Sequence, residues 1–473
     1  MKVAQAYRFE LDPNDITAGS LASHVGADRF AYNWGLALVK ARLGERARVM
    51  EQAVVEGLSA REAAALANTV AVPWTLASLR KEWNRAKAAA APWWAENSKE
   101  AYSSGLDRLA RALQAFSDSR SGRRKGPAVG FPRFRRRGGR ASVAFTTGAI
   151  AVVDDRHVRL PRLGVIRTKE RTTCLAGRLD ADTARILRAT VSSRAGRWYV
   201  SFGVEADRVE TVPADPASVI GVDVGVTHLA VLSSGEMVPN PRPLSRYARR
   251  MARLSAQLAR QHKGSRRRAR TKARIARCHA KVADLRADGL HKLTTRLATT
   301  YGTVVVEDLN VAGMTRRPKP VVDPDRPGAY LANQAAAKAG LNRAVLDAAV
   351  AELRRQLAYK CTWYGSRLAT AGRFYPSSKT CSACGTVKAK LSLATRTFDC
   401  EHCGVVIDRD LNAAVNLAAL AADISTVAGS GPETRNARTG MVPPREAGAG
   451  QPGKTGTASV EEAPASVLVG CDR

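Results

Sequence analysis

The chain has 473 residues, enough for about three ordinary domains. It carries 75 Lys and Arg against 42 Asp and Glu, and this formal net charge of +33 favours a polyanionic partner, with nucleic acid as the default. The absence of any apolar run near the ~20 residues of a spanning helix excludes a transmembrane protein, and no apolar signal segment begins the chain, so we expect an intracellular protein.

The N-terminal region predicts one strand followed by helices. Residues 2–11 alternate between apolar and polar side chains, as a strand does. Helical periodicity then continues to about residue 118 and includes aromatic residues such as Trp34, Trp83 and Tyr102. Aromatic side chains in a basic region can stack on bases, but they more often form a core, and we favour the core.

A basic, glycine-rich stretch, RSGRRKGPAVGFPRFRRRGGR, occupies residues 120–140. Its Gly and Pro residues argue against a helix. With Phe131 and Phe134 set between arginines, it is typical of a loop that grips phosphates, and the alternative is a solvated linker. The candidate nucleic-acid contacts here are Arg123, Arg124, Lys125, Arg135, Arg136 and Arg137.

Residues 141–206 alternate and are interrupted by Gly, Pro and Asp, which predicts short antiparallel strands in a small barrel or sandwich. The strand at 2–11 could join them, and the helical region would then be an insertion.

From about residue 217 the pattern alternates strand and helix, which indicates an α/β architecture. VIGVDVGVTHLAVLSSG predicts two strands, a long basic region predicts helices with a break near Gly264, TVVVEDL predicts another strand, and residues 341–364 predict one more helix. The basic helices supply the further candidate contacts Arg266, Arg267, Arg268, Arg270, Lys272 and Arg274. From about Gly429 the chain has almost no large apolar residues, so we expect disorder.

Four of the eight cysteines form two CxxC pairs that are separated by fifteen residues. This spacing is that of a four-cysteine zinc ribbon, and a site with four thiolates has no open position for catalysis. The predicted zinc ligands are Cys381, Cys384, Cys400 and Cys403. The remaining four cysteines are not spaced as metal ligands are, and we expect them to be free thiols.

Three acidic residues occupy positions where a carboxylate is costly. Asp223 lies within the apolar strand VIGVDVGV, Glu307 ends the apolar run VVVE, and Asp410 stands at a helix start. Together they fit a site for two Mg²⁺ ions, which need oxygen ligands and could support phosphodiester cleavage. Each also has a structural explanation: a turn for Asp223, an arginine pair for Glu307 and a helix cap for Asp410. The neighbouring Asp308 and Asp408 compete with Glu307 and Asp410 for these roles.

With these residues in place, the chain resembles the TnpB family, the RNA-guided nucleases of insertion sequences that are related to compact type V CRISPR effectors. The resemblance is carried by IGVDVGVTHLAV, VVVEDLNVAGM and YPSSKTCSACG…CEHCG…DRDLNAAVNL, which are similar to three RuvC motifs and a zinc ribbon. It implies a multidomain α/β protein in which Asp223, Glu307 and Asp410 are the catalytic acids and the four cysteines bind zinc.

The resemblance also implies a domain plan in which an RNase H-like (RuvC) nuclease carries an inserted zinc ribbon. An N-terminal wedge β-barrel would carry an inserted helical recognition lobe. The expected boundaries are 1–14 and 125–215 for the wedge, 15–124 for the recognition lobe, 216–375 and 406–422 for the nuclease, 376–405 for the ribbon and 423–473 for a disordered tail.

The function implied is an RNA-guided DNA endonuclease that cleaves double-stranded target DNA next to a short flanking motif. Its cofactors would be structural Zn²⁺, catalytic Mg²⁺ with Mn²⁺ as a substitute, and a guide RNA, and it would act in a prokaryotic cytoplasm at the nucleoid. A guided DNA-binding protein or repressor that does not cut is the main alternative, and a zinc-ribbon transcription factor or transposase accessory is a third. The sequence leaves open the guide, the flanking motif, the oligomeric state, and whether a transposon or a CRISPR locus encodes the chain.

Overall fold

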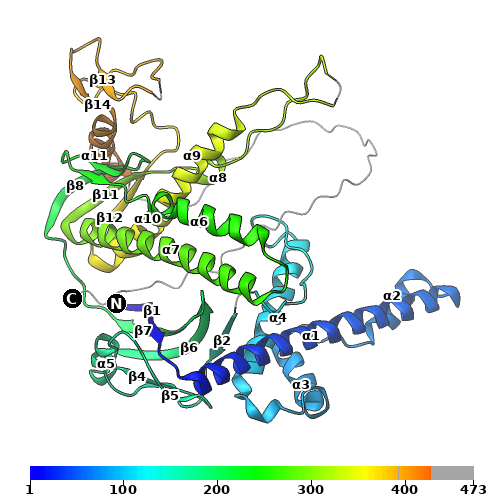
Figure 1. Cartoon of the computed structure of the whole chain (residues 1–473). Coiled ribbons are helices and arrows are strands. Elements are labelled where there is room, and N and C mark those ends of the chain that lie inside the picture. Colours follow the sequence, from blue (N-terminus) through cyan, green and yellow to red (C-terminus); the bar gives the residue numbers. More distant parts are fainter. Residues whose placement is uncertain (140, 327, 393, 428–473) are drawn as a thin grey trace. The chain divides into compact units, whose positions relative to one another are not determined.

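The computed structural model describes residues 1–139, 141–326, 328–392 and 394–427, and most of the predicted disordered tail lies outside these ranges. The chain divides into two compact units, the first formed by Met1–Arg208 and the second beginning at Val209 (Figure 1). Within the described ranges, no helix is both long enough and apolar enough to cross a membrane.

The first unit is built on an antiparallel sheet in the order β1-β7-β6-β2, which confirms that the N-terminal strand joins strands from beyond residue 141. These strands are β1 (Lys2–Leu11), β2 (Ala141–Phe145), β6 (Ala184–Arg194) and β7 (Arg197–Asp207). A second sheet holds β3 (Ala151–Val152), β4 (His157–Leu160) and β5 (Gly164–Arg167), and a bridge between Leu11 and Thr168 connects it to β1.

The strands of this unit therefore pair as two sheets, and the wedge β-barrel stays a prediction. Strands β3 to β5 have four residues or fewer. A short helix, α5 (Thr173–Asp180), precedes β6 and was not predicted.

The helical region is an insertion between β1 and β2, as expected. It contains α1 (Asp15–Val55), α2 (Ala60–Asn68), α3 (Leu76–Ala90), a short 3₁₀ turn (Trp94–Glu96) and α4 (Lys99–Arg120). Trp83 stacks on buried Tyr102 with ring centroids 4.9 Å apart, and both belong to one core that the helices share with the sheet. The aromatic residues of this region are therefore mostly core, as favoured above, and Trp93 is an exception at 45% exposure.

The second unit contains a five-stranded mixed sheet in the order β10-β9-β8-β11-β12. Its strands are β8 (Asp215–Asp223), β9 (His228–Leu232), β10 (Met237–Pro239), β11 (Tyr301–Glu307) and β12 (Arg367–Ala371). Strands β8, β11 and β12 run parallel, whereas β9 runs antiparallel to β8 and β10 antiparallel to β9. The apolar centre of β11 is buried on both faces, which explains the unbroken run of valines in this strand.

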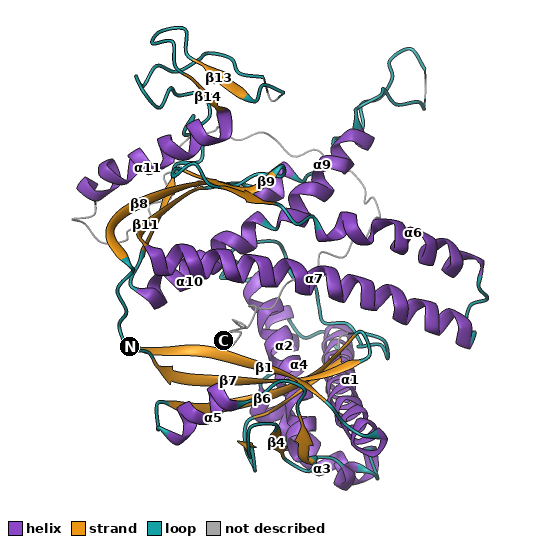
Figure 2. Cartoon of the chain, turned by 60° about the vertical axis from the view of Figure 1, so that its left-hand side comes forward, coloured by secondary structure: helices purple, strands orange, loops and turns teal. Residues whose placement is uncertain are grey.

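Helices cover both faces of this sheet (Figure 2). One face packs against α7 (Arg266–Thr300) and α10 (Val350–Tyr364), and α6 (Pro243–Arg260) forms a hairpin with α7 that turns at Gly264, where φ is +92°. The prediction of one helix over 341–364 is wrong. A residue with left-handed backbone, Ala349 at φ 52°, separates α9 (Ala335–Ala348) from α10, and β12 was not predicted at all. The short helix α8 (Val311–Met314) follows β11.

The opposite face packs against α11 (Arg409–Val427), which continues past residue 422, where the predicted tail begins. A Cβ atom on Gly221 of β8 would lie 1.9 Å from the carbonyl oxygen of Ala414, so only glycine allows this helix to lie so close to the strand. The segment between β12 and α11 carries the cysteine pairs and a two-stranded ribbon of β13 (Thr397–Asp399) and β14 (Val406–Asp408).

Candidate functional site

The three predicted acids meet at the carboxyl-terminal edge of the parallel strands. Val306 of β11 pairs with Val222 of β8, so Asp223 and Glu307 follow on neighbouring strands about 4.8 Å apart. Side chains alternate along a strand, and Val222 and Val306 face the core with α7 and α10. Asp223 and Glu307 therefore face α11, and Asp410 lies in the first turn of that helix.

The surroundings of Asp223 strongly perturb its acidity. Its burial, followed by the negative charges of Glu307 and Asp410, raises its pKa from 3.8 to about 7. Asp408 raises this pKa further, and the positive charge of Arg409 lowers it. A partly buried carboxylate beside other carboxylates is an arrangement that a divalent cation would stabilise.

Each neighbouring acid that competed for a role has another partner. Asp308 pairs with Arg354 and, at 2.7 Å, with Arg373, and these hydrogen bonds lower its pKa. Asp408 Oδ1 accepts hydrogen bonds from the backbone N–H groups of Asp410 (2.9 Å) and Leu411 (3.0 Å). Asp408 is thus the helix cap that was considered for Asp410, which leaves Asp410 at the edge of the sheet.

The two partners of Asp223 are held by other side chains. The Ser377 hydroxyl donates a hydrogen bond to Glu307, and Arg409 donates to Asp410 Oδ1 from Nη2 at 2.9 Å. The three carboxylates are close enough to interact, but among the described residues only the cysteine quartet has ligand atoms that all lie within 4.8 Å of one another. Donors that are all oxygen fit a hard cation such as Mg²⁺.

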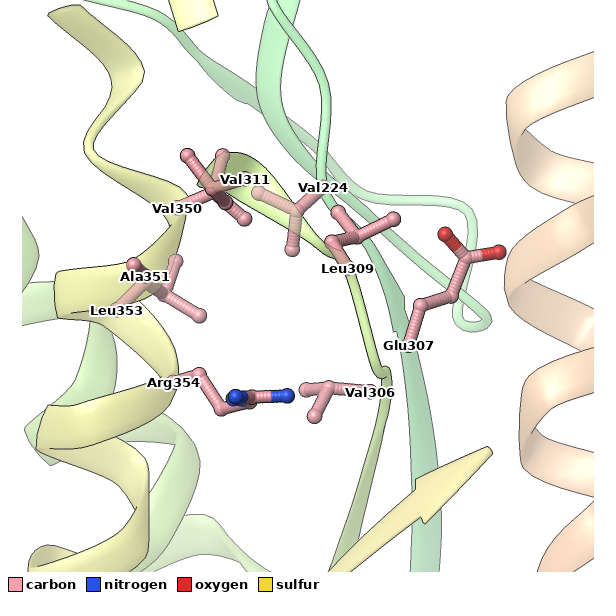
Figure 3. A pocket seen from close by; sticks show the side chains of 9 residues that line it. All are labelled: Val224, Val306, Glu307, Leu309, Val311, Val350, Ala351, Leu353 and Arg354. Carbon is pink, nitrogen blue, oxygen red and sulfur yellow. The ribbon is translucent and has the colours of Figure 1, made fainter. Parts of the chain in front are cut away.

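Figure 3 shows a small apolar pocket beside this site, lined on one side by Val306 and Leu309 and bounded by Arg354. The Glu307 carboxylate points away from these side chains, and Arg354 extends beside Val306. The pocket has a volume of about 10 Å³, room for about one water molecule, and cannot hold a nucleobase. The apolar surroundings instead hold the stem of Arg354, whose guanidinium contacts Asp308.

The four predicted zinc ligands form one cluster. The Sγ atoms of Cys381 and Cys403 lie 3.6 Å apart, as do those of Cys384 and Cys400. A tetrahedral zinc ion with Zn–S bonds of about 2.3 Å requires sulfur atoms about 3.8 Å apart, so the cluster has the size of such a site. Hydrogen bonding with Thr386 lowers the pKa of Cys384.

Two asparagines that sequence reasoning missed join the cysteine segment to the helix that carries Asp410. The buried side chain of Asn412 accepts a hydrogen bond from Ser382 N (2.9 Å) and donates to Thr380 O (2.7 Å). Asn416, one turn later, donates to Ser377 O (2.8 Å) and Thr380 O (2.7 Å). Two asparagines four residues apart in an otherwise apolar helix were the available signal, because buried amides need partners.

These hydrogen bonds connect the cysteine segment to the elements that carry Glu307 and Asp410. Ser377 donates to Glu307 and is itself held by Asn416, and Asn412 holds Ser382 beside Cys381. The chain leaves the sheet after β12 and returns at α11, and the segment between them is bonded to Glu307 through Ser377 and to α11 through Asn412 and Asn416.

The predicted nucleic-acid contacts remain predictions, and several of them have intramolecular partners, including Arg123, which pairs with Asp118 at 3.2 Å. Most of the twelve side chains are exposed. Arg268 donates to the carbonyl groups of Leu258 and Gln261 and so caps the last turn of α6. The Arg135 guanidinium lies 4.5 Å from the centroid of the Tyr32 ring.

Comparison with known proteins identifies relatives along most of the chain. Three relatives, from Mycobacterium tuberculosis, Streptomyces pristinaespiralis and Escherichia coli K12, carry the name "Putative RNA-guided DNA endonuclease", and the last is called InsQ. They are 38%, 33% and 30% identical to this chain, over 88%, 93% and 89% of its length and 86%, 95% and 92% of their own. The chain belongs to the TnpB family.

Three family models match parts of the chain. They are a "Probable transposase" over residues 201–317, a "Cas12f1-like, TNB domain" over 351–417 and a "Helix-turn-helix domain" over 1–48. In the last range this member of the TnpB family has strand β1 and one continuous helix, and not two helices joined by a turn.

Two solved structures of CRISPR complexes also align with this chain. A Cas12f1–sgRNA–target DNA complex covers 88% of this chain and 98% of its own, with 13% identity and a TM-score of 0.41. A CRISPR–Cas12f ternary complex covers 84% and 81%, with 15% identity and a TM-score of 0.30. The family assignment rests on the sequence relatives.

Proposed function

We propose that this chain is an RNA-guided DNA endonuclease that hydrolyses phosphodiester bonds with Asp223, Glu307 and Asp410 as its catalytic acids. The observation that carries the proposal is the meeting of these three acids, from two strands and one helix, at one edge and on one face of the sheet. Family membership and the names of the relatives support the guided, DNA-cleaving part of the proposal.

The sheet supports assigning the second unit to the RNase H-like (RuvC) class. Its order β10-β9-β8-β11-β12 places Asp223 and Glu307 at the carboxyl ends of two neighbouring parallel strands, where α/β proteins place their ligands. The first unit would then supply the wedge and its inserted helical recognition lobe, and residues 376–405 the zinc ribbon.

The acids would act by holding divalent cations against the scissile phosphate. When bound, two Mg²⁺ ions supply an activated water and stabilise the leaving oxygen. Asp223 would share the cations with both other acids, because its charge interacts with Glu307 and with Asp410. Ser377 orients Glu307 through its hydroxyl, and Asp408 positions Asp410 by capping the helix at its base. Asp308 is excluded from the cage by its pairing with Arg354 and Arg373.

The cysteine cluster would hold a structural zinc ion, with no open position for chemistry. Its hydrogen-bonded connection to Asn412 and Asn416 supports a role in holding the ribbon beside the catalytic edge, where it would contact a substrate strand.

The guide and target would be held mainly by their phosphates. The exposed Arg266, Arg267, Arg270, Lys272 and Arg274 of α7 lie in a basic helical hairpin that suits the backbone of a heteroduplex, whereas base pairing with the guide would select the sequence.

A paired assay tests the proposal. The chain is purified from cells that carry its native locus, the bound RNA is sequenced, and cleavage and binding are measured on one matching duplex with Mg²⁺. Asp223→Ala should abolish cleavage and leave guided binding intact, whereas Asp215→Asn, at the exposed start of the same strand, should change neither. Binding without cleavage by the wild-type chain would favour a guided repressor. Cleavage by Asp223→Ala at a near wild-type rate would show that the acids are misassigned.

A further inference from the structure

A hollow in the first unit has the composition of a nucleotide site. The cavity has a volume of about 550 Å³ and lies where the loop after α4 meets α1. Its lining residues are Lys40, Arg133, Phe134 and Arg136, so three of the four are cations and none is acidic. Phe134 is 49% exposed, and the ammonium group of Lys40 lies 4.8 Å from the centroid of its ring.

The two phenylalanines of this loop have different surroundings. Phe131 packs edge-on against Phe116 of α4, with ring centroids 5.2 Å apart, and is part of the packing around the core. Phe134 instead presents about half of its surface to solvent within the cavity. Phe134 therefore offers an accessible ring face among cations, and Phe131 does not.

The loop that forms the cavity is fixed in place although it contains no helix or strand. The Asn33 side chain donates to Arg135 O (3.0 Å) and accepts from Arg135 N (2.8 Å), and Ser119 Oγ accepts from Val129 N (2.8 Å). The Arg135 side chain lies on the Tyr32 ring, whereas the nearby side chains of Arg133 and Arg136 are exposed. A site that is already ordered loses little entropy when a ligand binds.

The lining selects for one class of ligand. Arginine and lysine bind phosphate, and an exposed aromatic ring offers a face on which any base can stack. The hollow is open to solvent and has room for a base and its phosphate. An acidic peptide would satisfy the cations and leave the ring without a planar partner, and bases inside a duplex are already stacked on each other.

We propose that Lys40, Arg133, Phe134 and Arg136 form a binding site for one unpaired nucleotide, whose base stacks on Phe134 and whose phosphate the cations hold. The proposal rests on the proposed function only in that the chain handles nucleic acid, and it does not require cleavage. RNA and single-stranded DNA share this chemistry, so separate probes distinguish them.

The test uses the full chain with short single-stranded RNA and DNA oligonucleotides that carry one 2-aminopurine, and a fully paired duplex of the same length. Stacking on an aromatic ring quenches 2-aminopurine, and fluorescence anisotropy gives the affinity. The variants are Phe134→Leu, which keeps the apolar volume but removes the planar ring, and Phe134→Ala. Trp93→Ala is the matched control, because Trp93 is an aromatic residue of the same unit with 45% exposure.

We expect Phe134→Leu and Phe134→Ala to weaken single-strand binding roughly 5- to 100-fold and to abolish the local quenching. Duplex affinity should not change, and Trp93→Ala should bind like the wild-type chain. Arg133→Gln and Arg136→Gln should each reduce the slope of log affinity against log salt by about 1, without a change in base preference.

Wild-type binding and quenching by Phe134→Leu would overturn the proposal, and so would an equal loss of duplex affinity. These results are separate from those for the proposed function. Phe134-dependent binding in a chain that never cuts DNA supports the nucleotide site and contradicts the nuclease. Cleavage that depends on Asp223, together with unaltered binding by Phe134→Leu, supports the nuclease and contradicts the nucleotide site.

Discussion

Replacing Asp223 by asparagine separates the electrostatic cost of the acidic site from its function. Asparagine has nearly the shape of aspartate and cannot ionise. In the wild-type chain, burial and the charges of Glu307 and Asp410 oppose the ionised form of Asp223. Removing that charge should therefore stabilise the metal-free protein while it removes a proposed metal ligand.

The magnitude follows from the pKa of Asp223, which is about 7 in the folded chain against an ordinary 3.8. At about 1.36 kcal/mol per pKa unit, ionisation costs the folded state up to about 4 kcal/mol. Because the folded pKa is raised, the folded state binds more protons than the unfolded state between these two values. Stability should thus fall as pH rises from about 4 to about 7 and then stay level.

The assay is urea unfolding of the full chain in EDTA at pH 5 and pH 8, followed by the same measurement with Mg²⁺. At pH 8 in EDTA, Asp223→Asn should unfold at a higher urea concentration than the wild type, and the difference should shrink at pH 5. Added Mg²⁺ should stabilise the wild type more than the variant. Asp215→Asn, at the exposed start of β8, is the control and should follow the wild type in every condition.

A variant that is less stable than the wild type in EDTA at pH 8 would refute this reasoning, since Asp223 would then make a favourable contact in its charged form. A stability difference that does not change between pH 5 and pH 8 would refute it as well, because the effect would not arise from ionisation.

Further variants test three remaining assignments: the zinc ligands, the role of Arg268 and the choice between Glu307 and Asp308. Cys381→Ser should lose one zinc ion per chain by elemental analysis and expose the ribbon to protease, because thiolate–zinc binding energy is also folding energy. Arg268→Ala should lower the free energy of unfolding by roughly 1–3 kcal/mol, because the cap on α6 is lost. Arg267→Ala should change the free energy of unfolding by no more than about 0.5 kcal/mol and should make RNA binding less dependent on salt concentration. Glu307→Gln should abolish cleavage at any Mg²⁺ concentration, whereas Asp308→Asn should still cleave DNA. Loss of cleavage in Asp308→Asn with cleavage retained in Glu307→Gln would assign the catalytic role to Asp308.

The sequence alone determined those features that depend on near neighbours. Alternation predicted the N-terminal strand, the unbroken apolar run predicted β11, and the spacing of two CxxC pairs predicted one cysteine cluster. Each of these follows from local geometry, because a strand repeats every two residues and a CxxC turn aims two sulfurs at one point. The prediction of one helix over 341–364 was wrong because no local signal marked Ala349 as the break.

Only the tertiary structure decided which partners two adjacent acids have. The alternation of the strand favoured Glu307 over Asp308 as the catalytic acid, and that role stays a prediction. In the folded chain Arg354 of α10 and Arg373, which follows β12, pair with Asp308, whereas the Ser377 hydroxyl donates to Glu307.

The same holds for Phe131 and Phe134, of which one packs on Phe116 and the other lines a cavity with Lys40. Hydrogen bonds, ion pairs and packing between residues far apart in the chain depend on where the backbone brings them together. Local periodicity carries no information about that position, and the folded chain alone supplies it.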